Sequence, residues 1–179
     1  MGAKVALLRG INVGGNRKVP MAELREVAEG LGLTRVRTLI ASGNLVFEGD
    51  GTPDALEAKL EAAIEARFGF PVAVVVRTAA QWQAFAAANP FPDEGASDPS
   101  KLMMTVGKRP ATEADAAALR PRASDGERVE CAGAAIWLWL PNGAGRSKLA
   151  AAPPGKDLWT TRNWRTILAI KEMLCSPSP

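Results

Sequence analysis

A glycine-rich segment with three basic side chains lies near the start of the sequence. Residues 8–21 read LRGINVGGNRKVPM. A glycine-rich turn between a strand and a helix can point several backbone N–H groups at one phosphate, and arginine and lysine side chains add positive charge. The segment therefore predicts an anion site. Its candidate ligands are Arg9, Gly10, Asn12, Gly14, Gly15, Arg17 and Lys18.

The same segment also has a purely structural explanation. A phosphate-binding P-loop needs Gly-Lys followed by Ser or Thr, whereas Gly15 is followed by Asn16 and Arg17, and the dinucleotide spacing GxGxxG is absent. Glycines suit a long loop whose backbone adopts positive φ, with its basic side chains in solvent. The sequence leaves both interpretations open.

A second polar group surrounds the expected start of a C-terminal helix. Residues 160–163 read TTRN and stand directly before Trp164; on a helix, Arg162 and Arg165 would be one turn apart. Unpaired N–H groups at the positive end of a helix favour an anion, although a capping threonine and a buried Trp164 would explain the same residues. The candidate ligands of this second site are Ser147, Lys148, Thr160, Thr161, Arg162 and Asn163.

Several catalytic chemistries lack their required side chains. The sequence contains no His and no Tyr, which excludes histidine-based triads and most catalytic zinc sites. Cys131 and Cys175 cannot supply a metal cage by themselves, and a Ser-Lys dyad of the SxxK kind on Ser147 would need a lysine where Ala150 stands. We therefore predict no metal and no cofactor, and we name no catalytic residue.

The composition is that of a globular protein. Hydrophobic residues make up 47% of the 179 residues and charged residues 23%. The longest apolar runs are much shorter than the roughly 20 residues that cross a bilayer, and the first residues lack a signal-peptide core. Two cysteines fit reduced thiols, so we expect a cytoplasmic protein that does not contact a membrane.

Charge is unevenly distributed along the chain. Residues 1–40, 41–140 and 141–179 carry net charges of +4, −5 and +4, which together give the overall charge of +3. If the two basic ends meet in space, they form a patch that attracts anions.

Apolar patterning predicts two similar halves. The first half has the order β-α-β-β-α-β, which is the split βαβ or ferredoxin-like arrangement. Its expected strands are 4–9, 36–40, 45–48 and 72–76, and its helices are 20–31 and 52–68. The second half repeats β-α-β-β and ends in a helix. Its expected elements are strands 102–106, 128–131 and 135–140 and helices 112–119 and 163–174.

We therefore predict an α+β fold of two ferredoxin-like modules, the second degenerate, packed as one body. The predicted divisions are a first module (1–90, including a short helix), a linker (91–100), a second module with the C-terminal helix (101–175) and a tail (176–179). Trp137 and Trp139 alternate with Ile and Leu, so both faces of that strand are apolar and need cover. The first module is the simplest cover.

Ser42-Gly43-Asn44 joins the second and third strands and is typical of a turn, since Gly and Asn tolerate a left-handed backbone. Ser42, Gly43 and Asn44 are thus either a structural turn or a second ligand site. We expect this turn at the opposite end of the sheet from the glycine-rich segment. The two would then not share one small-molecule site, unless the strands bend or bulge.

Three stretches of the sequence resemble the bacterial family known as domain of unknown function 1697. They are residues 8–21, Ser42-Gly43-Asn44 leading into Val46-Phe47, and Ser147-Lys148-Leu149 followed by residues 160–164 and Thr166. The resemblance implies a bacterial protein with two ferredoxin-like parts and no established activity, substrate or cofactor. A departure lies at 150–157, where relatives more often have a continuous helix and Pro153-Pro154 should break it.

Three functional hypotheses follow. The first is a binding protein for a small phosphorylated or carboxylated ligand, or for a nucleic-acid backbone without sequence specificity. The second is a transferase-like enzyme that acts on a phosphate-bearing substrate through positioning and electrostatics. The third is a structural or dimerising protein without a small ligand.

Overall fold

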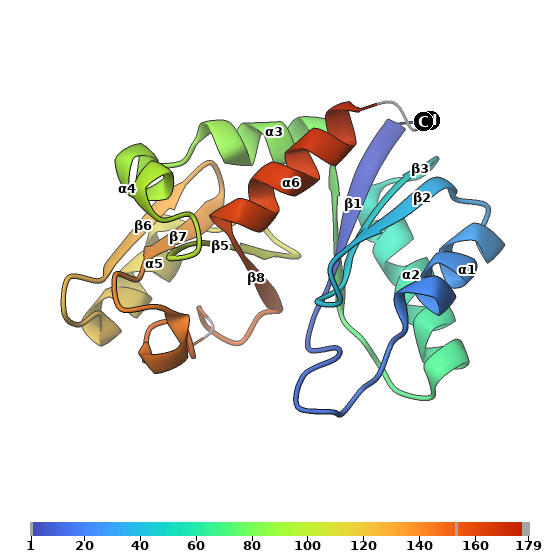
Figure 1. The fold of residues 1–179 in the computed structure, drawn as a ribbon, viewed down its shortest axis with the longest axis horizontal. Coiled ribbons are helices and arrows are strands. Elements are labelled where there is room, and N and C mark those ends of the chain that lie inside the picture. The colour runs from blue at the N-terminus through green and yellow to red at the C-terminus, as the bar shows by residue number, and fades with distance from the viewer. Residues whose placement is uncertain (1, 153, 177–179) are drawn as a thin grey trace. The chain divides into compact units, whose positions relative to one another are not determined.

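The computed structural model describes residues 2–152 and 154–176, which divide into two compact units. The first unit holds the residues up to Trp82 together with those from Ile170 onward, and the second holds Gln83–Ala169. Each unit contains one four-stranded antiparallel sheet. Figure 1 labels the helices and strands.

The first unit follows the order that the sequence predicts. Its elements are β1 (Gly2–Leu8), α1 (Met21–Gly30), β2 (Thr34–Leu39), β3 (Asn44–Gly49), α2 (Pro53–Phe68), β4 (Val74–Thr78) and the start of α3 (Ala79–Ala87). The strands lie in the order β2-β3-β1-β4. Leu7 of β1 stands opposite Asn44 of β3 and Val75 of β4, which fixes the register of the centre of the sheet.

Helices α1 and α2 cover one face of this sheet (Figure 1). Helix α2 begins where Thr52 Oγ1 accepts a hydrogen bond from Ala55 N at 3.3 Å, and it ends at Gly69, whose φ is +80°. Its apolar stripe is buried against alternate residues of the strands. The centre of this core contains Ala6, Leu8, Leu24, Leu45, Phe47, Leu60, Ile64, Val74 and Val76.

Side chains also protect the outer edge of β4. Every second N–H group of this strand points away from β1, and three such groups donate to carboxylate or amide oxygens. The acceptors are Glu61 for Val74 N (2.9 Å), Glu57 for Val76 N (2.8 Å) and Gln81 for Thr78 N (2.9 Å). Because both glutamates belong to α2, this helix both covers the sheet and closes its edge.

The second unit repeats the chain path of the first. Its elements are the rest of α3, α4 (Pro92–Ser97), β5 (Leu102–Gly107), α5 (Glu113–Leu119), η1 (Arg120–Arg122), β6 (Arg128–Ala132), β7 (Ala135–Trp139), η2 (Ala144–Arg146), β8 (Trp159–Asn163) and the start of α6 (Trp164–Cys175). The strand order β6-β7-β5-β8 matches β2-β3-β1-β4 position by position. A shared backbone contact follows the first strand of each unit: Arg9 N donates to Ala73 O at 3.0 Å, and Lys108 N donates to Leu158 O at 3.3 Å.

The second unit has no helix in the place of α2. Its described residues between β7 and β8 form turns, bends and the short 3-10 helix η2. Pro153 lies outside the described residues, and the chain on either side of it is not helical, as proline chemistry predicts. The prediction of an α+β fold with two ferredoxin-like modules, the second degenerate, is confirmed.

The segment 91–100, which we expected to be a linker, contains helix α4 and packs within the second unit. Phe91 is buried, and a Cβ added to Gly95 would lie 2.9 Å from Leu102 Cδ2. The prolines that suggested a linker instead include Pro92 in the first turn of this helix, where proline is well tolerated. The unit boundary falls earlier, within α3. Of the predicted tail, residues 177–179 lie outside the described residues.

The second apolar face of β7 is covered within its own unit. Trp137 is fully buried, its Nε1 donates to Ala132 O at 3.2 Å, and its ring lies edge-on to Trp164 of α6 with 5.7 Å between the centroids. Trp164 of the same unit therefore provides part of the cover of this face. The packing of the two modules as one body stays a prediction.

Candidate functional site

The topology of the first unit brings three loops to one end of its sheet. Strands β1 and β2 are both antiparallel to β3, so they run in the same direction and end at the same edge. Residues 9–20, which we call the glycine loop, and the turn 40–43 therefore lie together, and the loop before β4 joins them. Leu8 N donates to Gly43 O at 2.8 Å.

The expectation that turn 40–43 lies at the opposite end of the sheet from the glycine loop was wrong. A helix lies between β1 and β2, and it returns the chain to the starting end of β1, so β2 repeats the direction of β1. No bend or bulge is needed for the two segments to meet.

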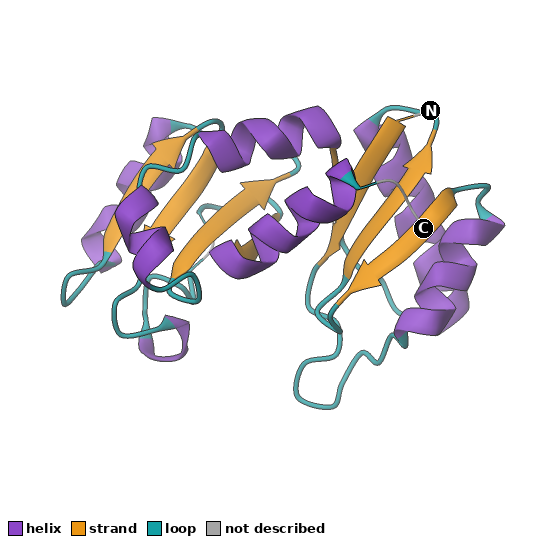
Figure 2. Cartoon of the chain, turned by 45° about the horizontal axis from the view of Figure 1, so that its top comes forward, coloured by secondary structure: helices purple, strands orange, loops and turns teal. Residues whose placement is uncertain are grey.

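The centre of the glycine loop is a small hairpin formed by residues 12–17. Asn12 N donates to Arg17 O at 3.1 Å, and Asn16 N donates to Val13 O at 3.2 Å. Gly14 and Gly15 have φ of +61° and +78°, the conformation of a two-residue turn that glycine adopts without strain. Figures 1 and 2 show this loop extending beyond the ends of the strands.

The Asn12 side chain holds this hairpin to its neighbours. Its Nδ2 donates to Val19 O at 2.9 Å and to Ala41 O at 2.7 Å, and its Oδ1 accepts from Val19 N at 2.8 Å. Its backbone has a φ of +53°, which asparagine tolerates better than most residues. Asn12, a candidate ligand from the sequence, therefore fixes the shape of the glycine loop.

Ser42, Gly43 and Asn44 also have structural contacts. Gly43 has a φ of +88°, and an added Cβ would lie 2.7 Å from Leu8 Cβ and 2.8 Å from Ile11 Cδ1. Asn44 is fully buried, and its Nδ2 donates to Leu39 O at 2.9 Å and to Ser42 Oγ at 3.2 Å. The turn thus packs closely against Leu8 and Ile11 and in this way supports the glycine loop.

Three cations of the glycine loop, Arg9, Arg17 and Lys18, are exposed. Among the residues that the structure describes, no carboxylate forms an ion pair with any of them. The Arg17 guanidinium lies 5.8 Å from the centre of the Phe70 ring, and its Nη1 would lie 3.8 Å from a Cβ on Gly10. The Arg17 side chain therefore lies between Gly10 and the Phe70 ring.

An open hollow of about 400 Å³ lies between the glycine loop and turn 40–43. Its lining is mostly apolar, with the Lys18 side chain as its cation. The lining residues are Asn12, Gly15, Lys18, Val19, Pro20, Met21 and Ala41. Sequence reasoning missed the last four, because only the topology shows that turn 40–43 stands beside the start of α1.

The second candidate group occupies different places from those the sequence suggested. We expected Arg162 and Arg165 one turn apart on a helix, but Arg162 belongs to β8 and is buried. Its Nη1 donates to Thr160 Oγ1 and to Thr161 O, both at 2.8 Å, and burial lowers the pKa of its guanidinium to about 10. The Thr161 hydroxyl lies 2.7 Å from the Thr105 hydroxyl.

The start of helix α6 is occupied by contacts within the second unit. Asn163 Oδ1 accepts from Thr166 N at 2.9 Å, and Arg165 N donates to Pro99 O at 3.3 Å. The cap is therefore an asparagine and not one of the two threonines. Ser147 is buried and its Oγ accepts from Ala150 N at 3.0 Å, whereas Lys148 is exposed.

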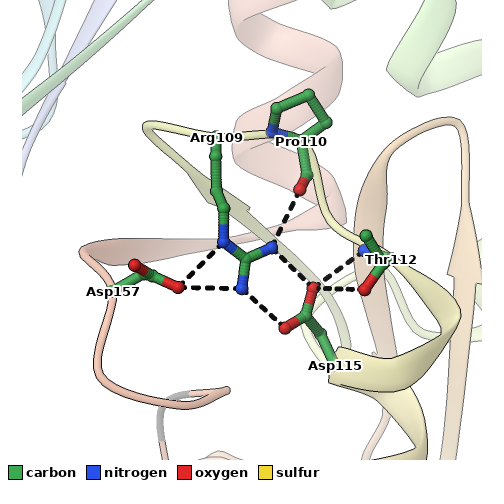
Figure 3. Close-up of polar contacts among 5 residues, drawn as sticks. All are labelled: Arg109, Pro110, Thr112, Asp115 and Asp157. Atoms are coloured by element: carbon green, nitrogen blue, oxygen red, sulfur yellow. Dashed lines mark hydrogen bonds and ion pairs between the residues drawn. The ribbon is translucent and has the colours of Figure 1, made fainter.

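One polar cluster of the second unit escaped the sequence analysis altogether. Arg109 follows β5, in the connection that corresponds to the glycine loop, and it binds two carboxylates (Figure 3). Its Nη1 and Nη2 donate to Asp115 at 2.8 and 2.7 Å, and its Nε donates to Asp157 at 2.8 Å. Thr112 N and Oγ1 donate to Asp115 as well, at 2.8 and 2.9 Å.

The charges in this cluster stabilise one another. The hydrogen bonds from Arg109, with those from Thr112, hold the pKa of the Asp115 carboxyl well below its ordinary value. Asp115 and then Asp157 raise the pKa of Arg109. The sequence signal that could have revealed this cluster is Thr112 followed by the acidic Asp115 three residues later, which is the pattern of a capping box.

Residues 1–137 match the family described as Protein of unknown function (DUF1697). This chain belongs to that family. No curated protein matches the sequence. A solved structure of a conserved bacterial protein from Streptococcus pneumoniae is similar over 96% of this chain and 98% of its own, with a TM-score of 0.77 and 24% identity. The predicted family is confirmed, and the similar structure supports the fold.

The described residues contain neither a membrane-crossing helix nor a group of side chains suited to a metal ion. None of their helices has the length and apolar character that crossing a membrane requires. Within the same part of the chain, no three His, Cys, Asp or Glu residues are grouped so that they could hold a metal ion.

Proposed function

We propose that this member of the DUF1697 family binds a small phosphorylated or carboxylated ligand through the glycine loop. The observation that carries the proposal is the lack of an acidic partner for Arg9, Arg17 and Lys18 among the described residues. Three like charges on one ordered loop repel one another, so an anion bound there relieves the repulsion as well as adding its own attraction.

The second unit supports the proposal by contrast. Its corresponding connection also carries a guanidinium, but two carboxylates occupy all the donor groups of Arg109 together with Pro110 O. The polar groups at β8 and at the start of α6 are likewise engaged in contacts within the protein. The glycine loop is thus the better candidate of the two predicted sites.

Preorganisation favours binding at the glycine loop. The hydrogen bonds of Asn12 and the hairpin turn fix the backbone before any ligand arrives, which lowers the entropy cost of association.

We place the activity in the cytoplasm, a location that the two free cysteines support.

A thermal-shift panel tests the proposal. Inorganic phosphate, mononucleotides, sugar phosphates, dicarboxylates and a short oligonucleotide are added to the wild type and to the triple variant R9A/R17A/K18A. We expect at least one small anion to raise the Tm of the wild type in a concentration-dependent way, and the triple variant to lose this shift.

The matched control is K59A/R122A/R146A, which removes one lysine and two arginines that are also exposed. This control should keep the shift. A shift of equal size in both triple variants, or no shift with any anion, contradicts the proposal. A shift with the oligonucleotide alone would replace the small ligand by a nucleic-acid backbone.

A further inference from the structure

We infer that the ligand of the glycine loop is amphiphilic: an apolar body that carries one phosphate or carboxylate. This inference rests on the proposed function and adds the class of ligand to it. It follows from the hollow beside Lys18. The surface of this hollow is mostly apolar, although the loop that forms it carries three exposed cations.

The floor of the hollow is apolar and is held in place by the fold. Val19 is buried in the core of the first unit, Met21 packs against that core, and Pro20 stands before the first turn of α1 with a fixed φ of −61°. The only polar side chains in the lining are those of Asn12 and Lys18. Because Nδ2 and Oδ1 of Asn12 both form hydrogen bonds within the protein, Lys18 is the polar side chain of the lining that is left to meet an anion.

Two residues that are next in sequence to the lining residues Asn12 and Ala41 have exposed apolar side chains. Val13 in the hairpin and Ile40 beside Ala41 are 69% and 57% exposed, the highest values among the large hydrophobic side chains of the described residues. Both belong to the segments between which the hollow lies.

The size of the hollow suits a small molecule. Its volume of about 400 Å³ falls within the range of roughly 300–1,000 Å³ that is usual for ligand sites, which are mostly apolar and carry a few polar groups that fix orientation. A bare phosphate would use the cations and leave the apolar floor in water. An amphiphilic anion uses both, because its charge meets Lys18 while its apolar body covers Pro20 and Met21.

Isothermal titration calorimetry with three probes tests this inference. The probes are inorganic phosphate, hexyl phosphate and hexanol, each titrated into the full chain. We expect hexyl phosphate to bind about tenfold or more tightly than phosphate, because burying two or more methylene groups is sufficient for that ratio. Hexanol, which lacks the anion, should bind more weakly than hexyl phosphate.

The variant Ala41→Phe fills the hollow from an exposed position and leaves the backbone oxygen that Asn12 binds. It should lower the affinity for hexyl phosphate by a much larger factor than the affinity for phosphate. Ala22→Phe, an exposed position of α1 outside the hollow, is the matched control and should change neither. Far-UV circular dichroism verifies that both variants are folded.

Two results would overturn the inference and leave the proposed function standing. The first is equal affinity of the wild type for phosphate and hexyl phosphate. The second is tight binding of hexyl phosphate that Ala41→Phe does not weaken. If neither anion binds the wild type, the proposed function fails and this inference fails with it.

Discussion

In the first unit, the connection that follows β1 runs from Arg9 to Pro20 and leaves three cations without an acidic partner among the described residues. In the second unit, the corresponding connection after β5 runs only from Lys108 to Thr112, and its Arg109 binds two carboxylates. The strands before both connections, and the first backbone hydrogen bond after them, correspond. The connection after the first strand thus forms ion pairs within the second unit, whereas in the first unit its cations have no acidic partner among the described residues.

A second difference explains the role of the acidic partners. In the first unit, α2 covers the sheet and its glutamates close the edge of β4. The second unit has no such helix, and Asp157, from the segment in its place, is held by Arg109. Arg109 therefore fastens a segment whose described residues are mostly irregular, with η2 as their short helical turn.

The largest effect that we expect is that of Gly43→Ala, at the place where turn 40–43 supports the glycine loop. A positive φ and overlap with Leu8 and Ile11 together should cost about 3 kcal/mol of the free energy of unfolding. Urea denaturation measures this change. Gly30→Ala is the control, since nothing lies within 4 Å of an added Cβ there, and it should not destabilise. A stable Gly43→Ala protein would show that the turn does not brace the loop.

Asn12→Ala should have the next largest effect. It removes three hydrogen bonds that join the hairpin to Val19 and Ala41, at a cost of about 1–3 kcal/mol. Amide hydrogen exchange should also become faster in residues 12–19. Asn16→Ala, an exposed position of the same hairpin, should change neither quantity appreciably. If both variants behave alike, the Asn12 side chain does not shape the loop.

The contrast between the two connections can be tested by one matched pair of variants. Arg109→Gln should lower the Tm, because it leaves Asp115 and Asp157 without their guanidinium. Arg17→Gln should leave the Tm unchanged or raise it slightly, because a repelling charge is removed. Equal losses in both variants, measured by calorimetry at low salt, would show that the cations of the two connections have the same role.

The smallest expected effect is a pH dependence that comes from Asp115. Its pKa is depressed in the folded protein, so its stabilisation is fully present above the ordinary carboxyl pKa of about 4 and is lost as the pH falls below that value. The Tm difference between the wild type and Asp115→Asn should therefore shrink between about pH 5 and pH 3. In an Arg109→Gln background the change should be smaller. A difference that stays constant with pH would contradict the ion pair.

The elements of the fold could be predicted because local patterns determine them. Thr52, Pro53 and Gly69 mark the ends of α2, and the alternation around Trp137 marks β7. The same patterning predicted the second, degenerate module, and the family resemblance implied the same fold. The linker was misjudged because Pro92 is compatible with a loop and with a first helical turn, and only the burial of Phe91 distinguishes them.

The candidate site was predicted only in part. The glycines and cations of the glycine loop could be read from residue types, and the positive φ values of Gly10, Gly14 and Gly15 are as expected. Turn 40–43 lies beside the glycine loop because of the directions of β1 and β2. These directions are determined by pairing between strand residues that are far apart in the sequence. The engagement of Arg162 depends on its burial, and that of Arg109 depends in part on Asp157, which is far away in the sequence, so the sequence could not separate paired from unpaired cations.

The most direct test of the central claim is a phosphate titration of the 15N-labelled protein, followed by backbone amide chemical shifts at constant ionic strength. We predict that the shifts that change are concentrated in residues 9–20, with saturable behaviour, and that residues 108–112 do not respond. Changes spread evenly over the surface, or concentrated at residues 108–112 or 160–166, would contradict the claim that the unpaired cations of the glycine loop form the anion site.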